Sequence, residues 1–197
     1  MSVPRWYRRH PVLAALVVVL AILATADRLR RGPVGADDDQ RYHNRVFAVA
    51  RVVDGDTLDI AAPDGSNPTT RVRLWGVDAP ELGGPRGREH FGPEASDFTH
   101  AMLGGRRVRL ELLPRRTRDR YQRLLAYVFL EGEDVSINAR LLAEGYAYAD
   151  RREAHDHPLA AEFARLEDRA RRSRAGLWRD AAPGGRPVRS PTGSERQ

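Results

Sequence analysis

The chain has 197 residues, which is enough for one domain with a hydrophobic core and appended segments. Its formal net charge is +6 and its basic residues are arginine, without any lysine, which favours polyanionic partners such as nucleic acid or an anionic membrane surface. The sequence contains no cysteine, and this excludes disulfides, thiolate catalysis and cysteine-ligated zinc or iron–sulfur sites.

The first segment, residues 1–31, is expected to be a signal peptide or a transmembrane anchor. Its apolar run over 11–26 has arginines on both sides and ends in Ala24-Thr25-Ala26, which matches a cleavage site for a secreted protein. As a helix the run is roughly 24 Å long, slightly short for a hydrocarbon core of about 30 Å. An uncleaved anchor, which contacts the membrane through 11–26, and a buried core helix are the alternatives. Cleaved or anchored, the domain is expected to be extracytoplasmic.

Residues 32–44 are polar and include three successive aspartates, which is typical of a linker. Metal binding by the aspartates is the alternative to a solvated linker. The folded domain is expected to span 45–178. Beyond it, residues 179–197 have the composition of a disordered tail.

Five short segments have the β-rich composition and turn signals of strands. Asp54-Gly55 is a hairpin-turn signal after the first of them. Strands are predicted over residues 46–53, 58–60, 70–77, 108–113 and 124–130.

Three helices are predicted between and after these strands. Pro93 opens the first, which ends at Gly104, and Ser136 caps the second. Apolar residues at helical spacing follow from Leu159, and Trp178 is interpreted as a core anchor. The predicted fold is α+β and mainly β: a five-stranded OB-fold barrel with three helices, preceded by an N-terminal hydrophobic helix.

Carboxylates and arginines follow the predicted strands. Carboxylates can gather a hard cation such as calcium, and arginines bind phosphate oxygens. A chain that brings both together is suited to cutting or holding a phosphodiester. The residues concerned are Asp54, Asp56, Arg73, Asp78, Glu81, Arg120, Tyr121 and Arg123.

Five motifs occur in one order along the chain: VVDGDT, RLWGVDAPE, FGPEAS, DRYQRLLAYV and a terminal GLW. In this order they resemble the staphylococcal nuclease (thermonuclease) family, over about residues 45–178. The resemblance implies a calcium-dependent phosphodiesterase on an OB-fold barrel, whose product carries a 3′-phosphate.

The resemblance also implies a role for each matching residue. Asp56 and Asp78 are expected to bind Ca²⁺ directly, with the backbone carbonyl of Ala79. Asp54 and Glu81 are expected to lie just outside, through water, and Glu81 is also the candidate general base. The scissile phosphate is expected between two arginines, with further substrate contacts close by in the chain. Arg73 and Arg123 are expected to bind this phosphate as catalytic residues, and Arg120 and Tyr121 are the expected substrate-binding residues.

Two departures from the family pattern concern substrate contacts and backbone geometry. Leu124 stands where the family commonly has glycine, and Arg151 and Glu153 stand where two tyrosines help to hold the base in the staphylococcal enzyme.

The sequence therefore predicts a monomeric calcium-dependent nuclease acting on DNA, with RNA as the second candidate substrate. A non-catalytic nucleic-acid-binding OB-fold module is the alternative, and a membrane-anchored structural protein is a third.

Overall fold

The computed structural model describes residues 36–83, 88–113, 116–151 and 158–179. The expected hydrophobic helix over 11–26 and nearly all of the expected C-terminal tail lie outside these residues. Within the described part of the chain, no helix is long and apolar enough to cross a membrane.

Five strands close into a barrel, as the sequence predicts, in the order β1-β2-β3-β6-β5. Neighbouring strands are antiparallel except β3 and β6, which are parallel. Leucine, isoleucine and valine side chains fill the interior, and β6 is buried along its whole length. The barrel strands are β1 (Val46–Asp54), β2 (Thr57–Ile60), β3 (Thr70–Leu74), β5 (Arg107–Leu112) and β6 (Leu124–Leu130).

The third strand is shorter than predicted because the chain turns at Gly76, which has a φ of 76°. Such a left-handed conformation is readily adopted by glycine. The residues after this turn form β4 (Val77–Asp78), which pairs with β7 (Tyr148–Ala149) as a separate two-stranded sheet. Asp78 is therefore carried by this small sheet and not by the barrel.

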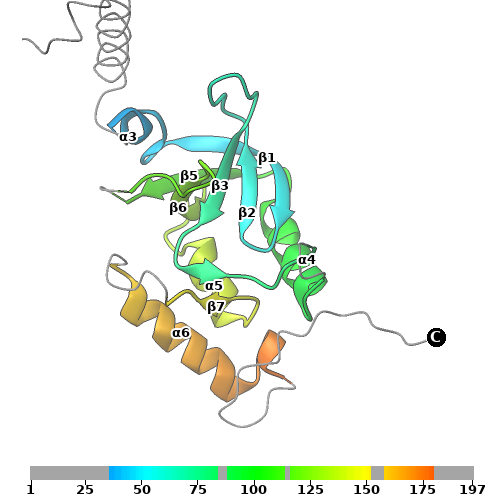
Figure 1. The fold of residues 1–197 in the computed structure, drawn as a ribbon. Helices are drawn as coiled ribbons and strands as arrows, with labels where there is room; N and C mark the ends of the chain where they lie inside the picture. The colour runs from blue at the N-terminus through cyan, green and yellow to red at the C-terminus, as the bar shows by residue number, and fades with distance from the viewer. Residues whose placement is uncertain (1–35, 84–87, 114–115, 152–157, 180–197) are drawn as a thin grey trace, which may run out of the picture.

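The three predicted helices are present as α4 (Gly92–Leu103), α5 (Ile137–Ala143) and α6 (Ala160–Ser173). Ser136 caps α5 as expected, because its side chain accepts a hydrogen bond of 3.1 Å from the backbone N–H of Ala139. In Figure 1 the barrel lies above a layer formed by α5, α6 and the small sheet, with α4 at its side.

The prediction of a linker over 32–44 is wrong for the second half of that segment, because α3 (Ala36–Tyr42) is a helix that packs near β5. Three aspartates occupy its first turn, where their negative charge is favourable to the helix dipole. Tyr42 is fully buried, and its hydroxyl lies 3.1 Å from Thr70 Oγ1. The folded unit therefore begins no later than Ala36.

The C-terminal end of the described chain closes the lower layer through η2 (Gly176–Trp178). A Cβ added to Gly176 would lie 2.3 Å from the carbonyl oxygen of Gly145, so only glycine permits this approach. Trp178 is 1% exposed and its ring meets the ring of Tyr148 edge-on, with centroids 5.5 Å apart. Trp178 is thus a core residue, as the sequence indicates.

Candidate active site

The turn between β1 and β2 carries the first two candidate carboxylates. Asp54 Oδ1 accepts a hydrogen bond of 3.0 Å from the backbone N–H of Asp56, which fixes the turn. Gly55 lies so close to the next part of the site that an added Cβ would be 2.7 Å from the Cβ of Ala79. Thr99 of α4 donates a 2.8 Å hydrogen bond to the carbonyl of Gly55. The turn is therefore packed from two sides.

Asp56 joins this turn to the segment that follows β3. It is 5% exposed, and its Oδ2 accepts a 2.7 Å hydrogen bond from the backbone N–H of Ala79. Its Oδ1 accepts a hydrogen bond from Thr57 Oγ1 at 3.1 Å and forms an ion pair with Arg73. One carboxylate thus connects three segments of the chain.

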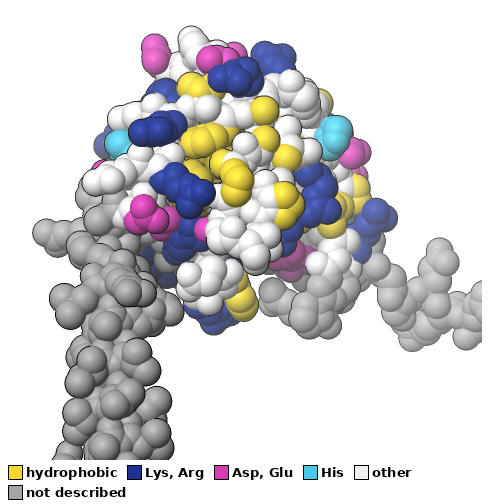
Figure 2. All heavy atoms as spheres, turned by 90° about the horizontal axis from the view of Figure 1, so that it is seen from above, with side chains coloured by type: hydrophobic (Ala, Val, Ile, Leu, Met, Phe, Trp, Pro, Cys, Tyr) yellow, Lys and Arg dark blue, Asp and Glu magenta, His cyan; other side chains and the backbone are white. Residues whose placement is uncertain are grey.

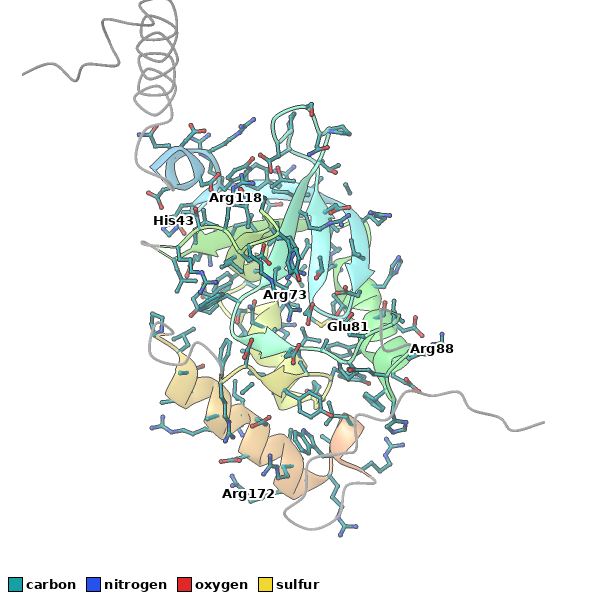
Figure 3. All side chains as sticks on the ribbon, in the orientation of Figure 1. His43, Arg73, Glu81, Arg88, Arg118 and Arg172 are labelled. Atoms are coloured by element: carbon teal, nitrogen blue, oxygen red, sulfur yellow. The ribbon has the colours of Figure 1, made fainter. Side chains whose placement is uncertain are left out.

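Arg73 lies between the two candidate calcium ligands. One terminal nitrogen pairs with Asp56, while the other lies 3.3 Å from Asp78 Oδ1 and donates a 3.1 Å hydrogen bond to the carbonyl of Val77. The side chain is 14% exposed. Burial, together with the positive charge of Arg123, lowers the pKa of Arg73 below its ordinary value. The structure therefore brings Arg73, Asp56 and Asp78 together, at the position of Arg73 that Figure 3 labels.

Arg123 is presented by a turn that begins at Asp119. Asp119 accepts hydrogen bonds from the backbone N–H groups of Tyr121 and Arg123, at 2.8 and 3.0 Å. It also binds the guanidinium of Arg123, with Nε 2.7 Å from Oδ2. An aspartate at the start of a turn that bonds backbone N–H groups further on is an Asx-type arrangement. Sequence reasoning missed this role, although DRYQR contained the signal.

Arg120 and Tyr121 lie on the exposed side of the same turn. Tyr121 is 64% exposed, and its hydroxyl accepts a 2.6 Å hydrogen bond from Arg120. The guanidinium carbons of Arg120 and Arg123 lie 4.7 and 5.5 Å from the centroid of the tyrosine ring. A tyrosine and two arginines therefore form one exposed group that can meet a phosphate.

Glu81 lies beyond Asp78 on a solvent-exposed loop, and Figure 3 places it between Arg73 and α4. Its backbone N–H donates a 3.2 Å hydrogen bond to Glu89 Oε2, and its carbonyl accepts a 2.9 Å bond from the N–H of Glu89. Loss of solvent contact and the negative charge of Asp54 raise the pKa of the Glu81 carboxyl. Glu89 is buried, and its role in this loop had no signal in the sequence.

The candidate carboxylates Asp54, Asp56 and Asp78 concentrate negative charge, which a bound cation can offset. Burial raises the pKa of Asp54, even though Arg73 acts to lower it. Within the described residues, no group of three or more histidine or acidic side chains converges as a ready metal centre. Two carboxylates and a backbone carbonyl nevertheless fit calcium, which also accepts water and carbonyl oxygens as ligands.

Comparison with known proteins decides the family. Residues 71–180 match the family described as "Staphylococcal nuclease homologue". The chain belongs to this family. It is 37% identical to the thermonuclease of Staphylococcus hyicus over 139 residues, which cover 70% of this chain and 77% of that protein. It is 32% identical to the micrococcal nuclease of Shigella flexneri over 179 residues, covering 86% of this chain and 84% of that protein.

Positions that depart from the family pattern have structural explanations in this member. Leu124 is fully buried at the start of β6 and is not among the described residues with a positive φ, so the position does not need glycine here. Arg151 pairs with the buried Glu167 at 3.0 Å, which ties the chain after β7 to α6. Glu153 lies outside the described residues. Tyr146 is a tyrosine close to these positions in the chain. Its ring stacks on Phe98 with centroids 4.1 Å apart and therefore packs within the fold.

Proposed function

We propose that this protein is a calcium-dependent nuclease that hydrolyses phosphodiester bonds of DNA, with RNA as a second substrate. The observation that carries the proposal is the position of Arg73, which binds Asp56 and Asp78 beside Glu81 and within the electrostatic field of Arg123. Names of relatives such as thermonuclease and micrococcal nuclease agree with this class of reaction.

Asp56, Asp78 and the backbone carbonyl of Ala79 would hold the calcium ion, and Asp54 would lie just outside this set. When bound, it polarises a phosphoryl oxygen and offsets charge on the substrate. Arg73 pairs with both carboxylates, so its guanidinium group lies beside the proposed metal site. In that position it would donate hydrogen bonds to phosphate oxygens of the substrate.

The protein side chains divide the chemistry among them. Glu81 orients the attacking water and accepts its proton, and the upward direction of its pKa makes it a stronger base than an ordinary carboxylate. Arg73 and Arg123 donate hydrogen bonds to the oxygens of the reacting phosphate as negative charge grows on them. Arg120 and Tyr121 contact a neighbouring phosphate group. Because these contacts are to phosphates, they do not depend on the sugar 2′-hydroxyl, and RNA is accepted with DNA.

The domain is proposed to act outside the cytoplasm, secreted or attached through residues 11–26. The apolar run needs a membrane or an export route, and calcium is more readily available outside the cell. A nuclease placed there also spares the nucleic acid of its own cell.

Incubation of the purified chain with labelled single- and double-stranded DNA and RNA tests the proposal. Cleavage is expected with calcium and should stop with a chelator. Binding without cleavage under both conditions would contradict the proposal and favour the binding module. That module has no use for Glu81, whose negative charge repels a phosphate.

A further inference from the structure

Three charged residues lie side by side on the outer surface of β1, β2 and β3. In the strand register Asp59 faces Arg51 on one side and Arg71 on the other. Arg51 Nη2 lies 2.9 Å from Asp59 Oδ2, while Arg71 donates to both carboxylate oxygens, at 2.8 and 3.2 Å. None of the three has a role in the candidate active site. Figure 2 shows arginine side chains, in dark blue, spread over one face of the molecule among acidic side chains.

The cluster keeps a positive charge that faces solvent. Asp59 is 5% exposed, and hydrogen bonds from Arg71 and Arg51 lower its pKa although burial acts to raise it. One ionised carboxylate therefore balances only one of two guanidinium groups. The side chains of Arg51 and Arg71 are 63% and 46% exposed. Each guanidinium has five N–H donors, so most donors stay available to a ligand.

The cluster lies next to the candidate active site. Arg71 and Arg73 are two residues apart on β3 and point to the same side of the strand, so their backbones are separated by about 6.7 Å. The hydrogen bonds that Arg71 donates to Asp59 are the main cause of the upward shift in the pKa of Arg71, and the negative charge of Asp54 adds to it, so Arg71 lies within the field of an active-site carboxylate. Arg73, Arg71 and Arg51 thus form a row of arginines that extends from the candidate active site over the outer surface of the sheet.

We propose that Arg51 and Arg71 form a second phosphate-binding subsite, for the single nucleic-acid strand whose reacting phosphate lies at Arg73 and Arg123. The proposal rests on the proposed function and extends it from one phosphate to a longer segment of strand. OB-fold proteins bind oligonucleotides over the face of their second and third strands, which matches this position. Contacts of this kind fix the register of a strand without selecting its bases.

Asp59 is the positioning residue of the subsite. Its two oxygens orient both guanidinium groups before a ligand arrives, which reduces the side-chain freedom lost on binding.

The salt dependence of binding measures the phosphate contacts directly. A fluorescent oligothymidylate of twelve nucleotides is titrated with the purified chain. A chelator is present to remove calcium, so that the oligonucleotide is not cut. Arg71→Gln and Arg51→Gln should each weaken binding and flatten the plot of log affinity against log salt by about 0.7, the value for one contact on a single strand. Arg107→Gln is the matched control, because Arg107 is also exposed and pairs with Glu131 at 2.9 Å on another part of the barrel. Wild-type slopes in both test variants would overturn the subsite.

Cleavage of substrates of two lengths separates binding from simple stabilisation. With calcium, the ratio of kcat/KM on the twelve-residue oligonucleotide to that on a dinucleotide should fall several-fold in Arg71→Gln and Arg51→Gln, and should not change in Arg107→Gln. If the cluster only stabilises the barrel, the substitutions should change the free energy of unfolding and leave this ratio of kcat/KM values unchanged. If Arg71→Gln does not fold, Arg51→Gln decides, because it removes a single hydrogen bond.

The results distinguish this subsite from the proposed function. If the substitutions flatten the salt dependence as expected but the wild-type chain cuts neither substrate, the nuclease proposal is overturned and the subsite is supported. A chain that cuts both substrates, with slopes and length ratio unaffected by the substitutions, overturns the subsite alone. An effect confined to duplex DNA also contradicts the subsite, which is proposed for a single strand.

Discussion

The guanidinium group of Arg118 binds both carboxylate oxygens of Asp38, with hydrogen bonds of 2.8 Å from Nε and from Nη2. Arg118 also binds Asp64 in the loop between β2 and β3, and donates a 3.0 Å hydrogen bond to the carbonyl of Gln122. Figure 3 places Arg118 at the α3 side of the barrel, above Arg73. Helix α3, the β2–β3 loop and the turn carrying Arg123 are therefore joined by one arginine.

Replacement of Asp38 should destabilise the domain strongly. Asp38→Ala removes two charged hydrogen bonds from Arg118, whose side chain is 17% exposed, and leaves Asp64 as its carboxylate partner, so the loss should be about 1.5–3 kcal/mol. Urea unfolding followed by circular dichroism measures the change. Glu131→Ala is the control, because it breaks the exposed pair with Arg107 and should cost less than about 1 kcal/mol. Equal losses in the two variants would contradict the role given to Asp38.

The contribution of Asp38 should depend on pH with a definite sign. Although burial acts to raise it, hydrogen bonds from Arg118 and Thr117 hold the pKa of Asp38 below its ordinary value of 3.8. Protons therefore bind more readily to the unfolded chain, so the stabilisation is complete above pH 3.8 and is lost as pH falls through the folded pKa. The difference in unfolding free energy between wild type and Asp38→Asn should be constant near neutrality and shrink below pH 3.8. A difference that grows on acidification would show the opposite sign.

Removal of Arg73 or Arg123, the two arginines proposed to bind the reacting phosphate, should reduce turnover while the fold stays intact. Arg73→Ala and Arg123→Ala are expected to lower kcat by about 10²–10³, by analogy with the loss of one oxyanion-hole donor. Arg→Lys at either position should also fail, because an ammonium group lacks the planar pair of donors. Steady-state cleavage of DNA, with circular dichroism as the folding control, measures the effect. Wild-type turnover in either alanine variant would show that the assignment is wrong.

Calcium should bind and activate, whereas magnesium should bind and support cleavage poorly. Magnesium demands a stricter octahedral arrangement, which two carboxylates from separate segments do not readily supply. Asp56→Ala should weaken calcium binding measured by titration calorimetry. Because Asp56 also binds the N–H of Ala79, the folded state of the variant must be checked alongside. Unchanged calcium affinity in a folded variant would remove Asp56 from the set of ligands.

The domain should be found outside the cytoplasm. A reporter that is active only after export, fused after Trp178, should give signal if residues 11–26 direct the nascent chain to the membrane, as we propose. Sequencing of the mature N-terminus separates the two routes: a start at Asp27 indicates cleavage, and an intact start indicates an anchor. A silent reporter in cells that make the fusion would place the domain in the cytoplasm.

The barrel could be predicted because its strands have alternating or continuous apolar patterns bounded by glycine, proline and aspartate turns. Helix α3 could not, since its charge run resembles a solvated segment and its stability depends on the distant contact between Tyr42 and Thr70. The two-residue strands β4 and β7 are likewise too short to give a periodic pattern, and they pair only because Gly76 turns the chain.

The members of the site could be named from motifs, but their connections could not. Nothing in the sequence indicates that Arg73 pairs with two candidate metal ligands at once, because that contact depends on the closing of the barrel. Glu89 acts through the backbone N–H of Glu81, a contact that exists only once the loop has formed, whereas the turn made by Asp119 had its signal in DRYQR.

The small sheet that carries Asp78 affects when the site is complete during synthesis. Asp78 pairs with Tyr148, and the ring of Tyr148 is covered by Trp178. A ribosome must therefore add the last residues of the domain before the strand bearing this carboxylate gains its full packing. We expect a chain stopped before residue 158 to lack nuclease activity, which can be measured on the isolated fragment. We therefore expect the nascent chain to have no nuclease activity until the domain has been synthesised to its end.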